Sequence, residues 1–115
     1  MSDTRPTIST HVLDLATGDP APGLEVALFR LGEDGSPQLL AELATDDDGR
    51  IRDLLDGGEL TEGDYQLAFD IAGYADEADD FFQSAAFALR VSDASRSYHV
   101  PLLLSPFGMS TYRGS

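Results

Sequence analysis

Hydrophobic and polar residues alternate along much of the chain with a period of two, a pattern typical of β-strands that bury one face. The alternation is clearest over residues 65–71, where the odd positions are large and apolar and the even positions are small or polar. Residues 85–91 repeat this pattern. Clusters of Gly, Pro and Asp separate earlier runs rich in β-branched and aliphatic residues, which predict strands over Thr7–Leu15, Leu24–Leu31 and about Gln38–Thr45.

One segment departs from the alternation. Gly73–Phe82 has helix formers, early acids and no β-branched residue, so we predict one short helix of about two turns there. Seven or eight short strands, counting two in the C-terminal tail, and one helix predict an all-β sandwich of two sheets. The 115 residues show no internal repeat or linker, so we expect a single domain over residues 1–115.

The C-terminal tail predicts a hairpin, because strand-like runs at residues 98–105 and 109–115 flank a three-residue loop of a length common in hairpins. In one register Ser105 pairs with Met109, and His99 then lies opposite Ser115. A slip of one residue would instead bring Tyr98 across from Ser115, and the sequence leaves both registers open. In the first register the chain end lies beside His99.

The charge of the chain excludes several classes of partner. There are 21 acidic residues against seven arginines and no lysine, for a formal net charge of −14. Nucleic acids and anionic membranes need a basic patch, so we expect neither as a partner. No run approaches the roughly 18 apolar residues of a membrane span, and the first ten residues lack the apolar region of a signal sequence, so we expect a cytoplasmic protein.

Recognisable metal and cofactor motifs are missing from the sequence. The chain has no cysteine, and its two histidines are one fewer than a three-histidine zinc site needs. The acidic turn Asp46–Gly49 lacks the ligand spacing of a calcium loop, and no phosphate loop or nucleophile elbow occurs. We therefore expect no metal and no cofactor.

Few side chains could carry chemistry at neutral pH. His11 lies in the first predicted strand and His99 in the next-to-last, and either one alone would be an ordinary strand histidine. Arg50 follows the acidic turn, and the chain ends in the polar run Tyr112–Ser115. The predicted hairpin strengthens a functional interpretation, since it folds this polar end back towards His99.

Five stretches carry a family resemblance: residues 11–14, 18–23, 45–50, 98–106 and 112–115. Together they resemble the transthyretin-related 5-hydroxyisourate hydrolase family of urate breakdown, over nearly the whole chain, and the terminal Tyr112-Arg113-Gly114-Ser115 is the most specific part. One departure is Asp46, where an asparagine is usual. The resemblance implies a transthyretin-like two-sheet sandwich with one short helix, assembled as a homotetramer (a dimer of dimers) whose active sites lie where the dimers meet.

The resemblance also implies an activity in purine catabolism. The cyclic amide of 5-hydroxyisourate would be hydrolysed at its N1–C6 bond, giving 2-oxo-4-hydroxy-4-carboxy-5-ureidoimidazoline. The implied catalytic residues are His11, Arg50 and His99, and the implied substrate-binding residues are Tyr112, Arg113, Gly114 and Ser115. Which histidine is the general base stays open at this point.

Two other functions are compatible with a β-sandwich. A non-catalytic transthyretin-like carrier would bind a small aromatic ligand in the same channel, but it would not need two histidines, an arginine and the Tyr112–Ser115 end together. An immunoglobulin-like interaction module would be exported and modular, which the N-terminal sequence does not favour.

Overall fold

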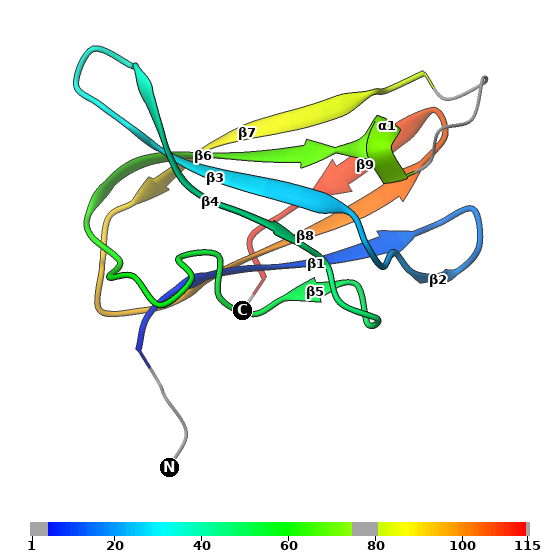
Figure 1. Cartoon of the computed structure of the whole chain (residues 1–115), viewed down its shortest axis with the longest axis horizontal. Helices are drawn as coiled ribbons and strands as arrows, with labels where there is room; N and C mark the ends of the chain where they lie inside the picture. The colour runs from blue at the N-terminus through cyan, green and yellow to red at the C-terminus, as the bar shows by residue number, and fades with distance from the viewer. Residues whose placement is uncertain (1–4, 75–80, 115) are drawn as a thin grey trace.

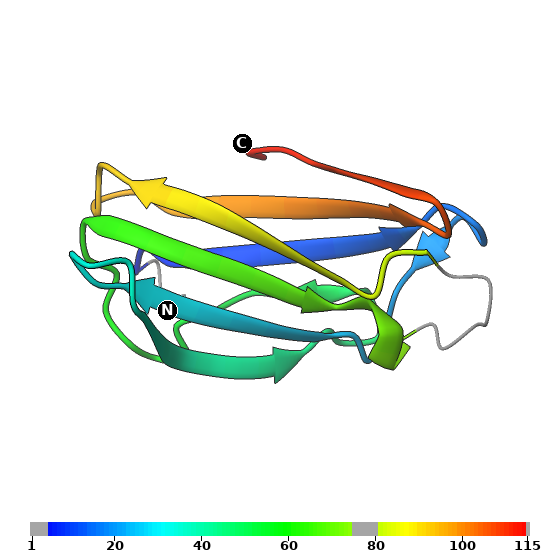
Figure 2. The ribbon, with the colours of Figure 1, turned by 90° about the horizontal axis from the view of Figure 1, so that it is seen from above.

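The computed structural model describes residues 5–74 and 81–114, which form two β-sheets packed face to face (Figure 1; Figure 2, from above). The first sheet has the order β2-β1-β8-β9, and β5 also pairs with β1. Its strands are β1 (Ile8–Asp14), β2 (Asp19–Pro20), β5 (Arg50–Ile51), β8 (Tyr98–Ser105) and β9 (Gly108–Thr111). The second sheet has the order β4-β3-β6-β7, from Pro37–Ala44, Glu25–Leu31, Gly63–Asp70 and Ser84–Val91.

The predicted all-β sandwich is confirmed. The described residues form nine strands rather than seven or eight, because β2 and β5 are only two residues long and leave no alternation in the sequence. Both are short additions to β1, antiparallel to it. In the described part of the chain, no helix is long and apolar enough to cross a membrane.

The core lies between the sheets and is built from the apolar face of each strand. In β6 and β1 every second residue is buried, as a period of two requires. The largest fully buried side chains come from both layers: Tyr65, Phe69, Ile8, Leu24, Leu28, Leu54, Leu67 and Leu102. The residues between them on β1 and β8 therefore face away from the core, which decides where the polar side chains of the first sheet lie.

The helix differs from the prediction over Gly73–Phe82. Helix α1 spans Ile71–Tyr74, so it begins two residues earlier, directly at the end of β6. The Asp70 carboxylate accepts a hydrogen bond of 3.1 Å from the Gly73 amide and caps the first turn, a role that the strand-like alternation up to residue 71 hides. Residues 75–80 of the prediction lie outside the described residues, and Phe81 and Phe82 are not helical.

The tail forms the predicted hairpin, but in the slipped register. Ser105 pairs with Gly108 and Leu104 with Met109, so the loop has two residues rather than three. The same register puts His99 opposite Gly114, so of the two registers that the sequence left open, the one that pairs His99 with Ser115 is excluded. The hydrophobic pattern explains the choice, since pairing with Leu104 turns Met109 towards the core, where it packs.

Gly49 joins the acidic turn to the first sheet and should tolerate no side chain. Its φ is +75°, and an added Cβ would lie 2.5 Å from the carbonyl oxygen of Val12. We expect Gly49→Ala to lower the free energy of unfolding by clearly more than Gly18→Ala, whose φ is +80° but whose Cβ would meet nothing within 4 Å. Gly18→Ala is the control, because it imposes only the strain of a positive φ, which costs about 1–3 kcal/mol. Urea unfolding measures both, and equal losses would contradict the steric argument.

Candidate active site

Two of the three proposed catalytic residues are direct neighbours on the first sheet. Because Ile8, Thr10 and Val12 are buried, the intervening His11 lies on the outer face of β1. The antiparallel pairing of β1 with β5 puts Arg50 directly beside His11. The short strand β5 thus has a clear role, which is to carry an arginine to the outer face of β1.

The third residue, His99, lies on the same face one strand away. In the parallel pairing of β1 with β8, His99 is the partner of Ser9, two residues before His11. His99 is half-buried, whereas Tyr98 and Val100 on either side point into the core. The sequence therefore brings His11, Arg50 and His99 together although they are far apart along the chain.

Arg50 and His99 border a hollow of about 340 Å³ on the outer face of the sheet, and His11 lies next to Arg50 outside its lining. Its lining residues are Ser9, Thr10, Arg50, Ile51, Arg52 and His99. A guanidinium provides donors in a planar fork suited to carboxylate-like or carbonyl oxygens, and an imidazole can accept a proton near neutral pH. The hollow therefore has the groups needed to hold a small anionic or carbonyl-bearing molecule next to a base.

The acidic turn fixes the geometry of Arg50 and His11. One carboxylate oxygen of Asp46 accepts hydrogen bonds of 2.9 Å from the backbone amides of both Asp48 and Arg50. These bonds, that from the Arg50 amide above all, hold the pKa of Asp46 below its ordinary value. An asparagine oxygen could accept the same two bonds, so this departure from the family pattern leaves the turn intact. The turn also presents the Asp48 carbonyl to His11 Nε2, at 2.9 Å.

The His99 ring is held on two sides. Its Nδ1 lies 2.8 Å from the Oγ of Ser9. On the opposite edge, a Cβ added to Gly114 would lie 2.7 Å from His99 Cδ2, and the Gly114 amide donates a hydrogen bond of 2.7 Å to the His99 carbonyl. The tail thus packs against His99 with a residue that has no side chain.

The surroundings of His99 favour its neutral form. Partial burial of the imidazole is the main cause of a lowered pKa, and the positive charges of Arg50 on β5 and His11 on β1 act in the same direction. A histidine with a lowered pKa keeps an unprotonated nitrogen at neutral pH. His99 is therefore equipped to act as a base.

We expect the titration midpoint of His99 to lie below about 6.5, the value of an unperturbed imidazole. Arg50→Ala should raise it, because one positive charge is removed while the burial stays. NMR titration of the ring signals, assigned with a His11→Asn variant, measures both values. A midpoint at or above 6.5 in the unmodified protein would contradict this account of the site.

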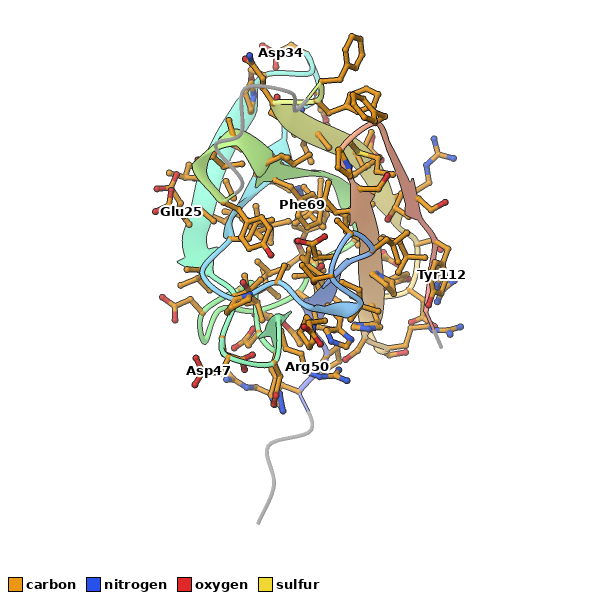
Figure 3. All side chains as sticks on the ribbon, turned by 90° about the vertical axis from the view of Figure 1, so that its right-hand side faces the viewer. Glu25, Asp34, Asp47, Arg50, Phe69 and Tyr112 are labelled. Carbon is orange, nitrogen blue, oxygen red and sulfur yellow. The ribbon has the colours of Figure 1, made fainter. Side chains whose placement is uncertain are left out.

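The tail residues do not all reach the hollow. In the observed register Gly114 lies against His99, whereas Arg113 lies on the other side, with its guanidinium carbon 4.7 Å from the centroid of the Tyr98 ring. Tyr112 is 57% exposed at the edge made by β9, well apart from Arg50 (Figure 3). Ser115 lies outside the described residues.

Two residues of the site escape the sequence analysis. Ser9 contacts His99, and Arg52 lines the hollow beside Arg50. The period of two carried a signal for Ser9, since a residue two positions before His11 in a strand lies on the same face. Over residues 5–74 and 81–114, no group of three or more His, Asp or Glu side chains is placed to hold a metal ion.

Known proteins with similar sequences and structures cover nearly the whole chain. Residues 8–114 match the HIUase/Transthyretin family. A 5-hydroxyisourate hydrolase of Halalkalibacterium halodurans is 38% identical over 115 residues, covering 94% of this chain and 97% of that protein. The structure of 5-hydroxyisourate hydrolase from Klebsiella pneumoniae aligns with a TM-score of 0.82 at 37% identity, covering 95% of this chain and 99% of that one. Sea bream transthyretin, solved in complex with thyroxine, aligns with a TM-score of 0.85 at 26% identity, covering 93% of each chain.

Proposed function

The chain belongs to the HIUase/Transthyretin family, and we propose that within it this protein hydrolyses 5-hydroxyisourate in urate catabolism. The observation that carries the proposal is that Arg50 and His99 line one hollow on the outer face of the first sheet, with His11 paired beside Arg50. The similarity to two 5-hydroxyisourate hydrolases at 37–38% identity supports the same activity. The cytoplasmic location expected from the sequence stays a prediction.

The proposed reaction is hydrolysis of the N1–C6 amide bond. The two histidines position a water molecule, which attacks C6 as its proton passes to the imidazole of one of them. The carbonyl oxygen of C6 then carries negative charge, and the Arg50 guanidinium holds it in a planar fork. When the N1–C6 bond breaks, N1 takes up a proton and C6 becomes a carboxyl group, so the atoms of one water are added across the bond.

The tail residues divide between two roles in this proposal. Gly114 packs against His99 and borders the substrate, whereas a substrate-binding role for Tyr112 and Ser115 rests on the family resemblance alone. Arg113 contributes indirectly, because its stacking on Tyr98 anchors the tail beside the hollow.

We further propose that four chains assemble as a dimer of dimers, with the hollows at the interface between dimers. The hollow lies on the outer face of the first sheet, where a second layer of protein would exclude water from the substrate. Four chains of −14 each would carry −56, so the assembly should weaken at low ionic strength. Light scattering across a salt series would measure the mass, and a monomer at every salt concentration would remove this part of the proposal.

The alternative of a non-catalytic carrier, on a fold shared with sea bream transthyretin in its complex with thyroxine, differs in a measurable way. If 5-hydroxyisourate is generated in situ by uricase, its decay should accelerate in the presence of this protein near neutral pH. A carrier would bind a small aromatic ligand in equilibrium dialysis and leave the decay at the buffer rate at micromolar protein.

A further inference from the structure

The two histidines of the site have partners of different chemistry. His11 Nε2 contacts the backbone carbonyl of Asp48, and a carbonyl oxygen can only accept a hydrogen bond. His11 Nε2 must therefore carry the hydrogen and donate it. This nitrogen is committed to the acidic turn and is not available to take a proton from water.

His99, in contrast, is held through its other ring nitrogen, Nδ1. Ser9 Oγ holds Nδ1 at 2.8 Å, and Gly114 closes the ring edge at Cδ2. Between Nδ1 and Cδ2 the imidazole ring has two further atoms, Cε1 and Nε2, and neither of these two contacts involves them. Within residues 5–74 and 81–114 no hydrogen bond to His99 Nε2 is found, so this nitrogen is the one free to meet a ligand.

We propose that Ser9 is the positioning residue of His99: its Oγ accepts a hydrogen bond from Nδ1–H, which leaves Nε2 unprotonated and free to take the proton of the attacking water. This assignment rests on the proposed hydrolysis and deepens it by naming the base. When Nε2 takes the proton, Nδ1–H still points at the same oxygen, so the ring need not turn during the reaction.

The chemistry of serine suits this task better than that of an acid. A carboxylate beside Nδ1 would stabilise the imidazolium and raise the pKa of His99, whereas a neutral hydroxyl orients the ring without adding charge. The other charged groups acting on His99, Arg50 and His11, both oppose its protonation. Ser9 therefore holds the base in place while these two groups keep it unprotonated.

Ring nitrogen NMR and kinetics on three variants test the role of Ser9. In the unmodified protein Nδ1 of His99 should show the signal of a protonated nitrogen and Nε2 that of an unprotonated one. In Ser9→Ala the ring signals should show a mixture of the two neutral tautomers, protonated at Nδ1 or at Nε2. The same variant should lower kcat about tenfold with little change in KM, as expected for one lost hydrogen bond. Ser9→Thr, which keeps the hydroxyl, should restore both readouts. Ser92→Ala, an exposed serine after β7, is the control and should change neither.

Each outcome decides a separate question. A protonated Nε2 in the unmodified protein, or a Ser9→Ala variant with unchanged ring signals and kcat, would overturn the role of Ser9. If no variant and not even the unmodified protein hydrolyses 5-hydroxyisourate, the proposed function fails. The ring signals would then still show whether Ser9 sets the form of His99.

Discussion

Arg50→Ala is expected to reduce kcat/KM for 5-hydroxyisourate by about 10²–10³, the loss typical when one stabiliser of a developing oxyanion is removed. Among the described contacts the Arg50 side chain donates no hydrogen bond within the chain, and the turn is held by the Arg50 backbone amide instead. The substitution should therefore leave the fold intact. Arg50→Lys should recover only part of the activity, because an ammonium keeps the charge but lacks the planar fork.

The matched control for this prediction is Arg90→Ala. Arg90 lies on β7 and its ion pair with Asp64 is largely exposed at both ends, so its removal should change neither activity nor stability appreciably. Steady-state kinetics on the three variants, with urea unfolding to verify the fold, provide the measurement. Near-normal turnover by Arg50→Ala would refute the role assigned to Arg50.

His99→Asn is expected to have the largest effect of any single change, a fall in kcat of about 10²–10⁴, the usual contribution of a general base. Asparagine keeps a polar group of similar size beside Ser9 but cannot take up a proton at neutral pH. His11→Asn should cost less, since the Nε2 of His11 is committed to the Asp48 carbonyl and serves to shape the site.

The order of these two losses is the informative result. Both variants keep the buried faces of β1 and β8 unchanged, so circular dichroism and urea midpoints should stay close to those of the unmodified protein. A greater loss for His11→Asn than for His99→Asn would reverse the assignment of the base.

The sequence predicts the strands well and their exact partners less well. The long strands follow from the period of two, because each buries one face against the other sheet. The register of β8 with β9 depends on a single residue of loop length, and only the packing of Met109 against the core decides it. The start of α1 depends likewise on a local cap, from Asp70, that no periodicity reveals.

The candidate site was likewise only partly predictable from the sequence. His11, Arg50 and His99 could be named from the sequence through the family resemblance, but their meeting requires β5, a strand of two residues, to pair with β1. The period of two places Ser9 on the face of His11, but a serine in a strand is common and the role of Ser9 comes from its parallel neighbour His99. Arg113 lies on Tyr98, away from the hollow, because of the register, so this placement could not be predicted from the sequence either.

If the hollow on the outer face of the first sheet is the active site, the protein hydrolyses 5-hydroxyisourate only while Arg50 and His99 are in place. The most direct test follows the decay of the uricase-generated substrate near neutral pH with the unmodified protein and with the double variant Arg50→Ala/His99→Asn. We expect the unmodified protein to accelerate the decay clearly over buffer, and the double variant, although equally folded, to leave it close to the buffer rate. No acceleration by the unmodified protein, or the same acceleration by both proteins, would contradict this expectation.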